Sequence, residues 1–268
     1  MSNFLIFLKG MFVGIANIIP GLSGGTVAVI LGIYEQLIEA LSNILKFKYD
    51  VFRVSFIFLF FVILGAIIGV FSFSFLIDWL STNFKEPLSY FFIGVLVSSI
   101  PYIVKKESIK LFKLSNVLVC LIFVLFGFVL IYLNQDIVLG VESEVTDFYL
   151  FLSSFVAAST MIIPGISGSL VLVLFGTYSF VISAIKSLDI STLLIVAISS
   201  SVGILSTSFF IKKALDNYFN RTMSAIVGLM IGTIPGLYVG FSSSLFVYNF
   251  LFLFLGVSLV WVFDYFNS

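Results

Sequence analysis

Six apolar stretches, each long enough to cross a lipid bilayer, constrain the fold of this 268-residue chain more than any other feature. A transmembrane helix needs about 20 consecutive apolar residues. The six stretches, with charges only near their ends, are residues 54–80, 88–104, 115–133, 190–211, 222–240 and 245–263. Only 10% of the chain is charged, whereas a soluble domain carries about 25%. The sequence therefore predicts an all-α integral membrane protein with a single transmembrane domain over residues 1–268.

The composition also restricts the chemistry that the chain can perform. It has no histidine, 13 basic and 13 acidic residues, and one cysteine, Cys120. Without histidine it lacks the commonest proton shuttle and transition-metal ligand, and without a basic excess it lacks the positive surface that nucleic acids need. We expect no cofactor, no metal site and no nucleic-acid partner. A membrane lipid-phosphate enzyme would need histidine or paired carboxylates for Mg²⁺, so an enzyme is the least favoured class.

Two further apolar segments are interrupted by a proline–glycine pair. Residues 4–19 run into Pro20-Gly21, and residues 148–163 run into Pro164-Gly165. Each first arm is too short to span comfortably, and the break removes backbone hydrogen bonds that lipid cannot replace. Such breaks occur at membrane depth only where protein or water surrounds them. We interpret both segments as re-entrant helical hairpins with buried tips; full spans, ten in all, are the alternative.

The second interrupted segment repeats the first. Residues 18–40 align with residues 162–184 without a gap, and 12 of the 26 positions from 16 to 41 have an identical partner. The matches include proline, glycine, serine and tyrosine, which burial in lipid does not select. Because three crossings follow each hairpin, the two repeats are expected to have inverted topology. The pattern predicts a first repeat, an external acidic linker and a second repeat at residues 1–133, 134–147 and 148–268.

The basic residues predict the orientation in the membrane. In this topology 11 of the 13 lysines and arginines lie on one face, and only Lys85 and Lys186 lie on the other. Cytoplasmic loops carry the excess of Lys and Arg. We therefore expect a multi-pass protein with both termini in the cytoplasm. Full spans would have the same parity, so the charges predict the orientation but not the depth of the hairpins.

The two breaks predict an anion site. A half-helix starts after each break, at about Gly24 and Gly168, and its first N–H groups lack intrahelical partners and lie at the positive end of the helix dipole. Phosphate is a typical ligand of such a helix start. The alternative is a junction of small residues that only lets helices pack closely. The candidate residues are Asn17, Pro20, Gly21, Ser23, Gly24, Gly25, Thr26, Pro164, Gly165, Ser167, Gly168 and Ser169.

Three polar side chains near the first break have more than one interpretation. Glu35 and Glu39 lie one helical turn apart, and an intramembrane carboxylate is a candidate for proton coupling. However, Glu35 is ten residues past Gly25, about 15 Å along a helix, which would bring it to the cytoplasmic interface near Lys46. Coupling and a solvated position are both kept as hypotheses. Asn17 either caps the broken backbone or contacts the substrate.

The residues around both breaks resemble a known family. The segments GIANIIPGLSGGTVAVILGIYEQLI from Gly14 and MIIPGISGSLVLVLFGTY from Met161 are similar to motifs of the bacterial polyprenyl-phosphate transporters, and the layout agrees over nearly the whole chain. In that family the motifs fall on the candidate residues above and on Glu35. Leu170 stands where the first copy has Thr26, so the resemblance implies two unequal anion sites.

The resemblance implies a substrate, a location and a mechanism. The protein would move undecaprenyl phosphate, or a related polyprenyl phosphate, from the outer to the cytoplasmic leaflet of the bacterial inner membrane, which recycles the carrier lipid. The half-helix N-termini would hold the phosphate, and an alternating-access change of conformation would pass it from one leaflet to the other while the prenyl tail stays in lipid. A secondary transporter of a small soluble anion is the alternative. The coupling ion, the prenyl length and the oligomeric state are left open.

Overall fold

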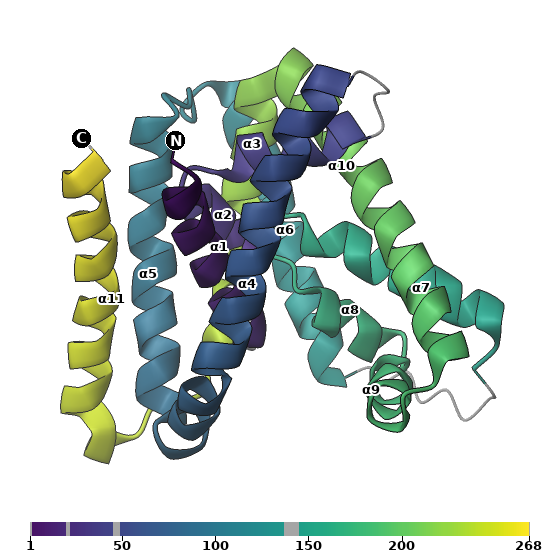
Figure 1. Cartoon of the computed structure of the whole chain (residues 1–268). Helices are drawn as coiled ribbons and strands as arrows, with labels where there is room; N and C mark the ends of the chain where they lie inside the picture. Colours follow the sequence, from purple (N-terminus) through teal and green to yellow (C-terminus); the bar gives the residue numbers. More distant parts are fainter. Residues whose placement is uncertain (1, 20–21, 45–48, 137–144, 268) are drawn as a thin grey trace.

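The computed structural model describes residues 2–19, 22–44, 49–136 and 145–267, and within these ranges every regular element is a helix (Figure 1). Most of the predicted linker, residues 137–144, lies outside the described residues, so its position is not assigned. Figure 1 places the N-terminal and C-terminal helices with their chain ends at the same end of the molecule. An all-helical chain with these apolar segments agrees with the predicted class of fold.

Thirteen helical elements follow one another along the described residues. The first half contains α1 (Asn3–Ile18), α2 (Gly24–Ile30), α3 (Tyr34–Ile44), α4 (Tyr49–Asn83), α5 (Lys85–Lys106) and α6 (Leu114–Asp136). The second half contains α7 (Asp147–Met161), α8 (Gly168–Leu174), α9 (Tyr178–Ser187), α10 (Ile190–Thr233), the 3₁₀ helices η1 (Ile234–Leu237) and η2 (Ser243–Leu245), and α11 (Phe246–Asn267).

By length and composition, five helices among the described residues can cross a membrane, or six if the bent pair α8 and α9 forms one span. The sequence also predicts six clean spans, and four of them correspond to α4, α5, α6 and α11. The other two, residues 190–211 and 222–240, are joined in α10. This helix is interrupted at Tyr218, whose backbone angles (φ −139°, ψ 45°) are not helical. A straight helix of this length would extend about 70 Å, more than twice the hydrocarbon thickness of about 30 Å, so α10 contributes two arms.

Helices from the two halves of the chain pack against each other. Within each half, α1 lies against α4, and α7 lies against the first arm of α10. Between the halves, α5 lies against α11, and the second arm of α10 lies against α6. Glycines mark these contacts: a Cβ on Gly228 would lie 2.4 Å from the Cys120 carbonyl oxygen, and one on Gly94 would lie 2.3 Å from that of Leu253. Contact across the halves therefore depends on small residues, as is usual in membranes.

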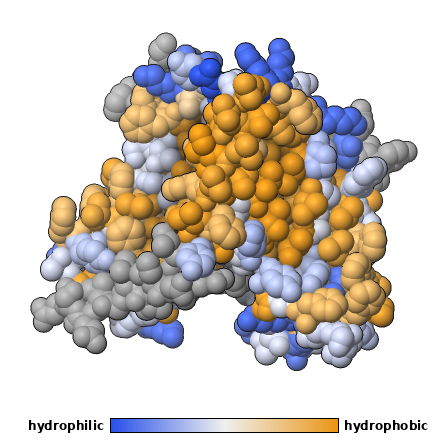
Figure 2. All heavy atoms as spheres, turned by 180° about the vertical axis from the view of Figure 1, so that it is seen from behind, coloured by the Kyte–Doolittle hydropathy of each residue, from blue (hydrophilic) through white to orange (hydrophobic). Residues whose placement is uncertain are grey.

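The surface of the molecule is suited to lipid. Figure 2 shows a broad hydrophobic area across the middle of one face, with hydrophilic residues gathered at the upper and lower ends. Large apolar side chains are widely exposed, including Phe71 at 79% and Phe75 at 82% on α4. In water such an area would drive aggregation, whereas in a bilayer it contacts acyl chains. The exposed apolar area agrees with a multi-pass membrane protein.

The α1–α4 contact provides a test of this packing. A Cβ on Gly65 would lie 2.1 Å from the carbonyl oxygen of Phe7, so Gly65→Leu must push the two helices apart. We expect it to lower the free energy of unfolding by about 1–3 kcal/mol or more, as overpacking does. Thermal unfolding of detergent-purified protein measures this, with Ile63→Leu as the control because Ile63 is 55% exposed on the same helix. Equal melting temperatures for the two variants would contradict the close contact.

Candidate anion-binding site

The two broken segments meet inside the protein. The backbone N–H of Gly165, in the second break, donates to the Thr26 hydroxyl at 2.8 Å and to the Ser23 hydroxyl at 3.2 Å, both after the first break. Gly165 has φ +94°, a conformation that favours glycine. The helices after the breaks begin at Gly24 and Gly168, as the sequence predicts. Pro20 and Gly21 lie outside the described residues, so the predictions for them stay open.

The start of α2 is filled by protein groups. Ser23 is its N-cap: the Ser23 hydroxyl accepts a hydrogen bond from the Thr26 N–H at 3.1 Å and lies 2.9 Å from the Thr26 hydroxyl. The Asn17 Oδ1 atom accepts a hydrogen bond from the Gly24 N–H at 3.0 Å, so Asn17 caps the broken backbone. Ser23 and Thr26 are 3% and 1% exposed, and a Cβ on Gly25 would lie 2.8 Å from the Ile162 carbonyl oxygen. In this conformation the α2 start joins the two segments and has no room for an anion.

The start of α8 is open by comparison. The hydroxyls of Ser167 and Ser169 lie 2.8 Å apart, and Ser167 makes no capping hydrogen bond to α8. Both serines line a cavity of about 530 Å³, together with Asn17 and Gly165. Pro164, the residue before Gly165, is buried. Because α8 has only seven residues, its dipole is short, so hydroxyl and amide groups are the main polar features of this cavity.

Further walls of the cavity come from α6, from η1 and from two tyrosines, one at the start of α9 and one directly after η1. Ile131 contributes from α6, five residues before that helix ends, and Pro235 and Gly236 contribute from η1. Tyr178 and Tyr238 add two phenol rings. The cavity lies in the half of the molecule away from the two chain ends, where Figure 1 places α8 and α9. No lysine or arginine is among its described lining residues.

The buried cation of the first segment lies at the opposite end of α2. Lys9 is 6% exposed and donates to the Leu31 carbonyl oxygen at 2.7 Å. Leu31 is the C-cap of α2, where unpaired carbonyls and the negative end of the dipole favour a cation. Lys106 lies close to the next residue, since a Cβ on Gly32 would be 2.7 Å from its Nζ atom. Lys9 therefore stabilises the end of α2, the Lys106 Nζ atom donates to the Tyr102 hydroxyl, and neither cation lines the cavity at α8.

The two candidate coupling carboxylates lie in different surroundings. Glu35 and Glu107 line a small cavity of about 180 Å³ with Tyr34, whose buried hydroxyl has no hydrogen-bond partner among the described residues. Partial burial and the nearby Glu107 carboxylate raise the pKa of Glu35, which lies on α3, outside the candidate spans. Glu39 lines a separate cavity with Asp50. Lys46, the predicted neighbour of Glu35, lies outside the described residues.

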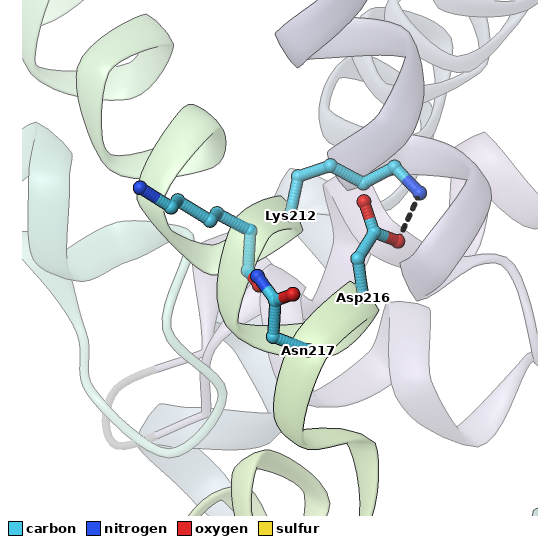
Figure 3. Close-up of polar contacts among 4 residues, drawn as sticks. Lys212, Asp216 and Asn217 are labelled. Atoms are coloured by element: carbon cyan, nitrogen blue, oxygen red, sulfur yellow. Dashed lines mark hydrogen bonds and ion pairs between the residues drawn. The ribbon is translucent and has the colours of Figure 1, made fainter.

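An ion pair on α10 lies near these carboxylates. The Lys212 Nζ atom is 2.7 Å from the Asp216 Oδ1 atom one turn later, just before the interruption at Tyr218 (Figure 3). In the same turn, the Asn217 side-chain amide donates to the Lys213 carbonyl oxygen at 2.8 Å. The positive charge of Lys212 partly offsets the effect of burial on Glu35, but the pKa of Glu35 is still raised overall. The end of the molecule that carries the termini therefore has a charged cluster that the cavity at α8 lacks.

One polar group was missed by the sequence analysis. The Glu86 carboxylate, at the start of α5, accepts hydrogen bonds from the Ser242 N–H at 2.6 Å and the Ser242 hydroxyl at 2.7 Å, and from the Asn249 side-chain amide on α11. Asn249 is fully buried. The sequence does contain an indication of this contact, because Asn249 is the one amide side chain in the apolar stretch 245–263 and would need a hydrogen-bond partner there. This network holds the segment before α11 against α5.

These features define a class: a helical membrane protein whose two broken segments meet beside a polar cavity. The chain matches the family model described as undecaprenyl phosphate translocase-like over residues 13–247, and it belongs to this family. It is 31% identical to a polyprenyl-phosphate transporter of Vibrio cholerae over 245 residues, which are 88% of this chain and 77% of the relative. It is 29% identical to a polyprenyl-phosphate transporter of Staphylococcus aureus over 249 residues, 89% and 87% of the two chains.

The comparisons agree with the family resemblance of the two motifs and with the expectation that this chain is not an enzyme, since both relatives are named as transporters. No solved structure matches the chain.

The contact between the two breaks can be tested through stability. Thr26→Val keeps the shape of the side chain but removes the acceptor 2.8 Å from the Gly165 N–H. We expect a loss of about 0.5–1.5 kcal/mol in the free energy of unfolding, because the Gly165 N–H loses its shorter hydrogen bond and keeps only the one to the Ser23 hydroxyl. Thr26→Ser, which keeps the hydroxyl, is the control. Thermal unfolding in detergent measures both, and a melting temperature for Thr26→Val equal to that of Thr26→Ser would contradict the contact.

Proposed function

We propose that this protein transports undecaprenyl phosphate, or a related polyprenyl phosphate, from the outer to the cytoplasmic leaflet of the bacterial inner membrane. The membership of the chain in a translocase-like family supports the substrate class. The main support for a phosphate-binding site is the polar cavity at the junction of the two broken segments. Return of the lipid phosphate to the cytoplasmic leaflet would recycle the carrier for the next round of use.

The phosphate headgroup binds in the cavity at α8. The hydroxyls of Ser167 and Ser169 and the side-chain amide of Asn17 can donate hydrogen bonds to phosphate oxygens, and each such bond to a charged group contributes about 1.5–3 kcal/mol. Since the described lining has no cation, the phosphate is held by polar groups and released without breaking an ion pair. This suits a transporter, which must bind its substrate and then let it go.

In the proposed mechanism the chain is built from two inverted repeats, and one half-helix start is filled while the other is open. Equivalent helices make equivalent contacts: α1 with α4 and α7 with the first arm of α10, then α5 with α11 and the second arm of α10 with α6. In the present conformation the cavity adjoins the start of α8 on the side away from the termini. Movement of the re-entrant hairpins that seals α8 and opens α2 would expose the phosphate to the opposite, cytoplasmic side. Both termini are assigned to the cytoplasm by the excess of lysine and arginine on that face.

The headgroup site is tested by removing its hydroxyls. We expect the double variant Ser167→Ala/Ser169→Ala to slow leaflet exchange of a polyprenyl phosphate in proteoliposomes by about tenfold or more, since two charge-assisted hydrogen bonds are lost. Ser201→Ala is the control, because Ser201 is exposed on α10 and bonds its own helix at Ala197. Wild-type exchange no faster than in protein-free vesicles would contradict the proposed function. Unchanged exchange in the double variant would contradict the site.

A transporter of a small soluble anion is the second candidate, because the cavity alone fits any phosphate. The two functions differ in their dependence on the tail. If transport of a short, water-soluble phosphate into proteoliposomes equals that of the lipid, or if inorganic phosphate competes as well as the lipid does, the soluble-anion function holds instead.

Glu35 is the better candidate for proton coupling, because it shares a cavity with Glu107 and its pKa is raised, so it takes up a proton at a higher pH than an ordinary glutamate. We expect the transport rate of the wild type to change with pH as Glu35 titrates. Glu35→Gln, which cannot titrate, should lose the part of the profile that Glu35 causes and keep only the part due to titration of the substrate phosphate, whereas Glu39→Gln should keep the full wild-type profile. Exchange rates from pH 5 to pH 9 measure this, and a wild-type profile in Glu35→Gln would contradict coupling at this residue.

A further inference from the structure

A further cavity, which neither the motifs nor the family match assigns, lies between α1, α2, α4, α5 and α11. It has a volume of about 370 Å³, within the range of ligand pockets. Every described side chain that lines it is apolar. We call it the apolar groove. Because it has no polar group to fix a headgroup, its occupant must be a hydrocarbon chain.

The apolar groove adjoins the polar cavity at α8. Ile19, at the end of α1, lines both. The contact between α5 and η1, where the Ser89 hydroxyl donates to the Leu237 carbonyl oxygen, joins elements that line the two cavities. Leu88 lines the groove on one side of this contact, and Gly236 lines the polar cavity on the other. A headgroup in the polar cavity would therefore lie next to one end of the groove.

The groove opens towards lipid. Three of its lining residues, Phe12, Leu76 and Leu259, are 50%, 44% and 46% exposed, and they come from α1, α4 and α11. Deeper residues such as Ile77 are buried. Figure 1 shows α4 and α11 at the outside of the molecule, and these exposed side chains lie where a chain can enter from the side without crossing water.

We infer that the apolar groove binds the part of the isoprenoid chain nearest to the phosphate of a polyprenyl phosphate. This rests on the proposed function and adds a tail-binding site to it. One groove beside one headgroup cavity fits a lipid with a single chain, rather than a phospholipid with two acyl chains. Lipid is as apolar as the groove, so moving the chain out of lipid gives little hydrophobic free energy. The binding free energy of the tail comes instead from close packing and from holding the chain beside the headgroup. The groove therefore sets selectivity for a long prenyl tail.

The experiment fills the groove and compares chain lengths. Leu76→Trp and Leu80→Trp place a larger side chain at two lining positions one turn apart on α4, whereas Phe75→Trp changes a neighbouring residue that is 82% exposed and lies outside the groove. Binding of prenyl phosphates of increasing chain length, and of inorganic phosphate, is measured on each protein in lipid nanodiscs. Melting temperatures within a degree or two of the wild type confirm that each variant is folded.

We expect the wild type to bind long prenyl phosphates more tightly than short ones. At least one of the two groove variants should bind the long chain about tenfold more weakly, as the loss of space for a few methylenes does in an apolar pocket. Inorganic phosphate binding should not change, and Phe75→Trp should behave as the wild type.

Two results overturn the groove as the tail site while leaving the proposed function intact: long-chain binding at wild-type strength in both groove variants, or equal weakening of a two-chain phosphatidic acid, which would make the groove a general lipid site. Folded wild type that binds no prenyl phosphate of any length overturns the proposed function, and the tail site with it.

Discussion

The hydrogen bonds from the Gly165 N–H to the hydroxyls of Thr26 and Ser23 are the interaction on which the site depends. A proline–glycine break exposes backbone groups, and at membrane depth these must find partners within the protein. Here the second break finds them after the first break, 139 residues away. The contact brings the two segments together, buries the start of α2 and leaves the start of α8 beside the polar cavity.

This asymmetry links the scarcity of charge to the proposed mechanism. The chain is 10% charged and has no histidine, and the described lining of the cavity at α8 has no lysine or arginine, so a phosphate bound there is held by hydroxyls, amides and backbone N–H groups. Two of the cations have other partners: Lys9 donates a hydrogen bond at the end of α2, and Lys212 forms an ion pair with Asp216. In the proposed cycle each half-helix start is open to the phosphate in one conformation and closed in the other. The filled α2 start and the open α8 start represent one of these two conformations.

Much of the fold could be predicted from local patterns. Apolar length predicted α4, α5, α6 and α11, and the motif residues predicted helix starts at Gly24 and Gly168. The interruption of α10 was expected only as a loop between two spans. In the structure the two arms of α10 instead meet at a kink at Tyr218, the single non-helical residue between them, with helical residues on both sides.

The site was less predictable than the fold, because its contacts join distant parts of the chain. The sequence indicates which residues surround each break. It does not indicate that Asn17 caps Gly24, or that Gly165 rather than an anion bonds Thr26. The bonds of Glu86 to Ser242 and to the Asn249 side chain depend in the same way on packing between α5 and α11. Such hydrogen-bond partners depend on the three-dimensional arrangement of the helices, and the spacing of residue types along the sequence does not predict them.

The most direct test of the central claim is an experimental structure of the protein in nanodiscs with a bound polyprenyl phosphate. The account predicts density for the phosphate at the junction of the two broken segments, within hydrogen-bond distance of the Ser167 or Ser169 hydroxyl, with the first part of the tail leading past Ile19. A phosphate bound away from both breaks, for example at Lys9 and Lys106, would contradict it.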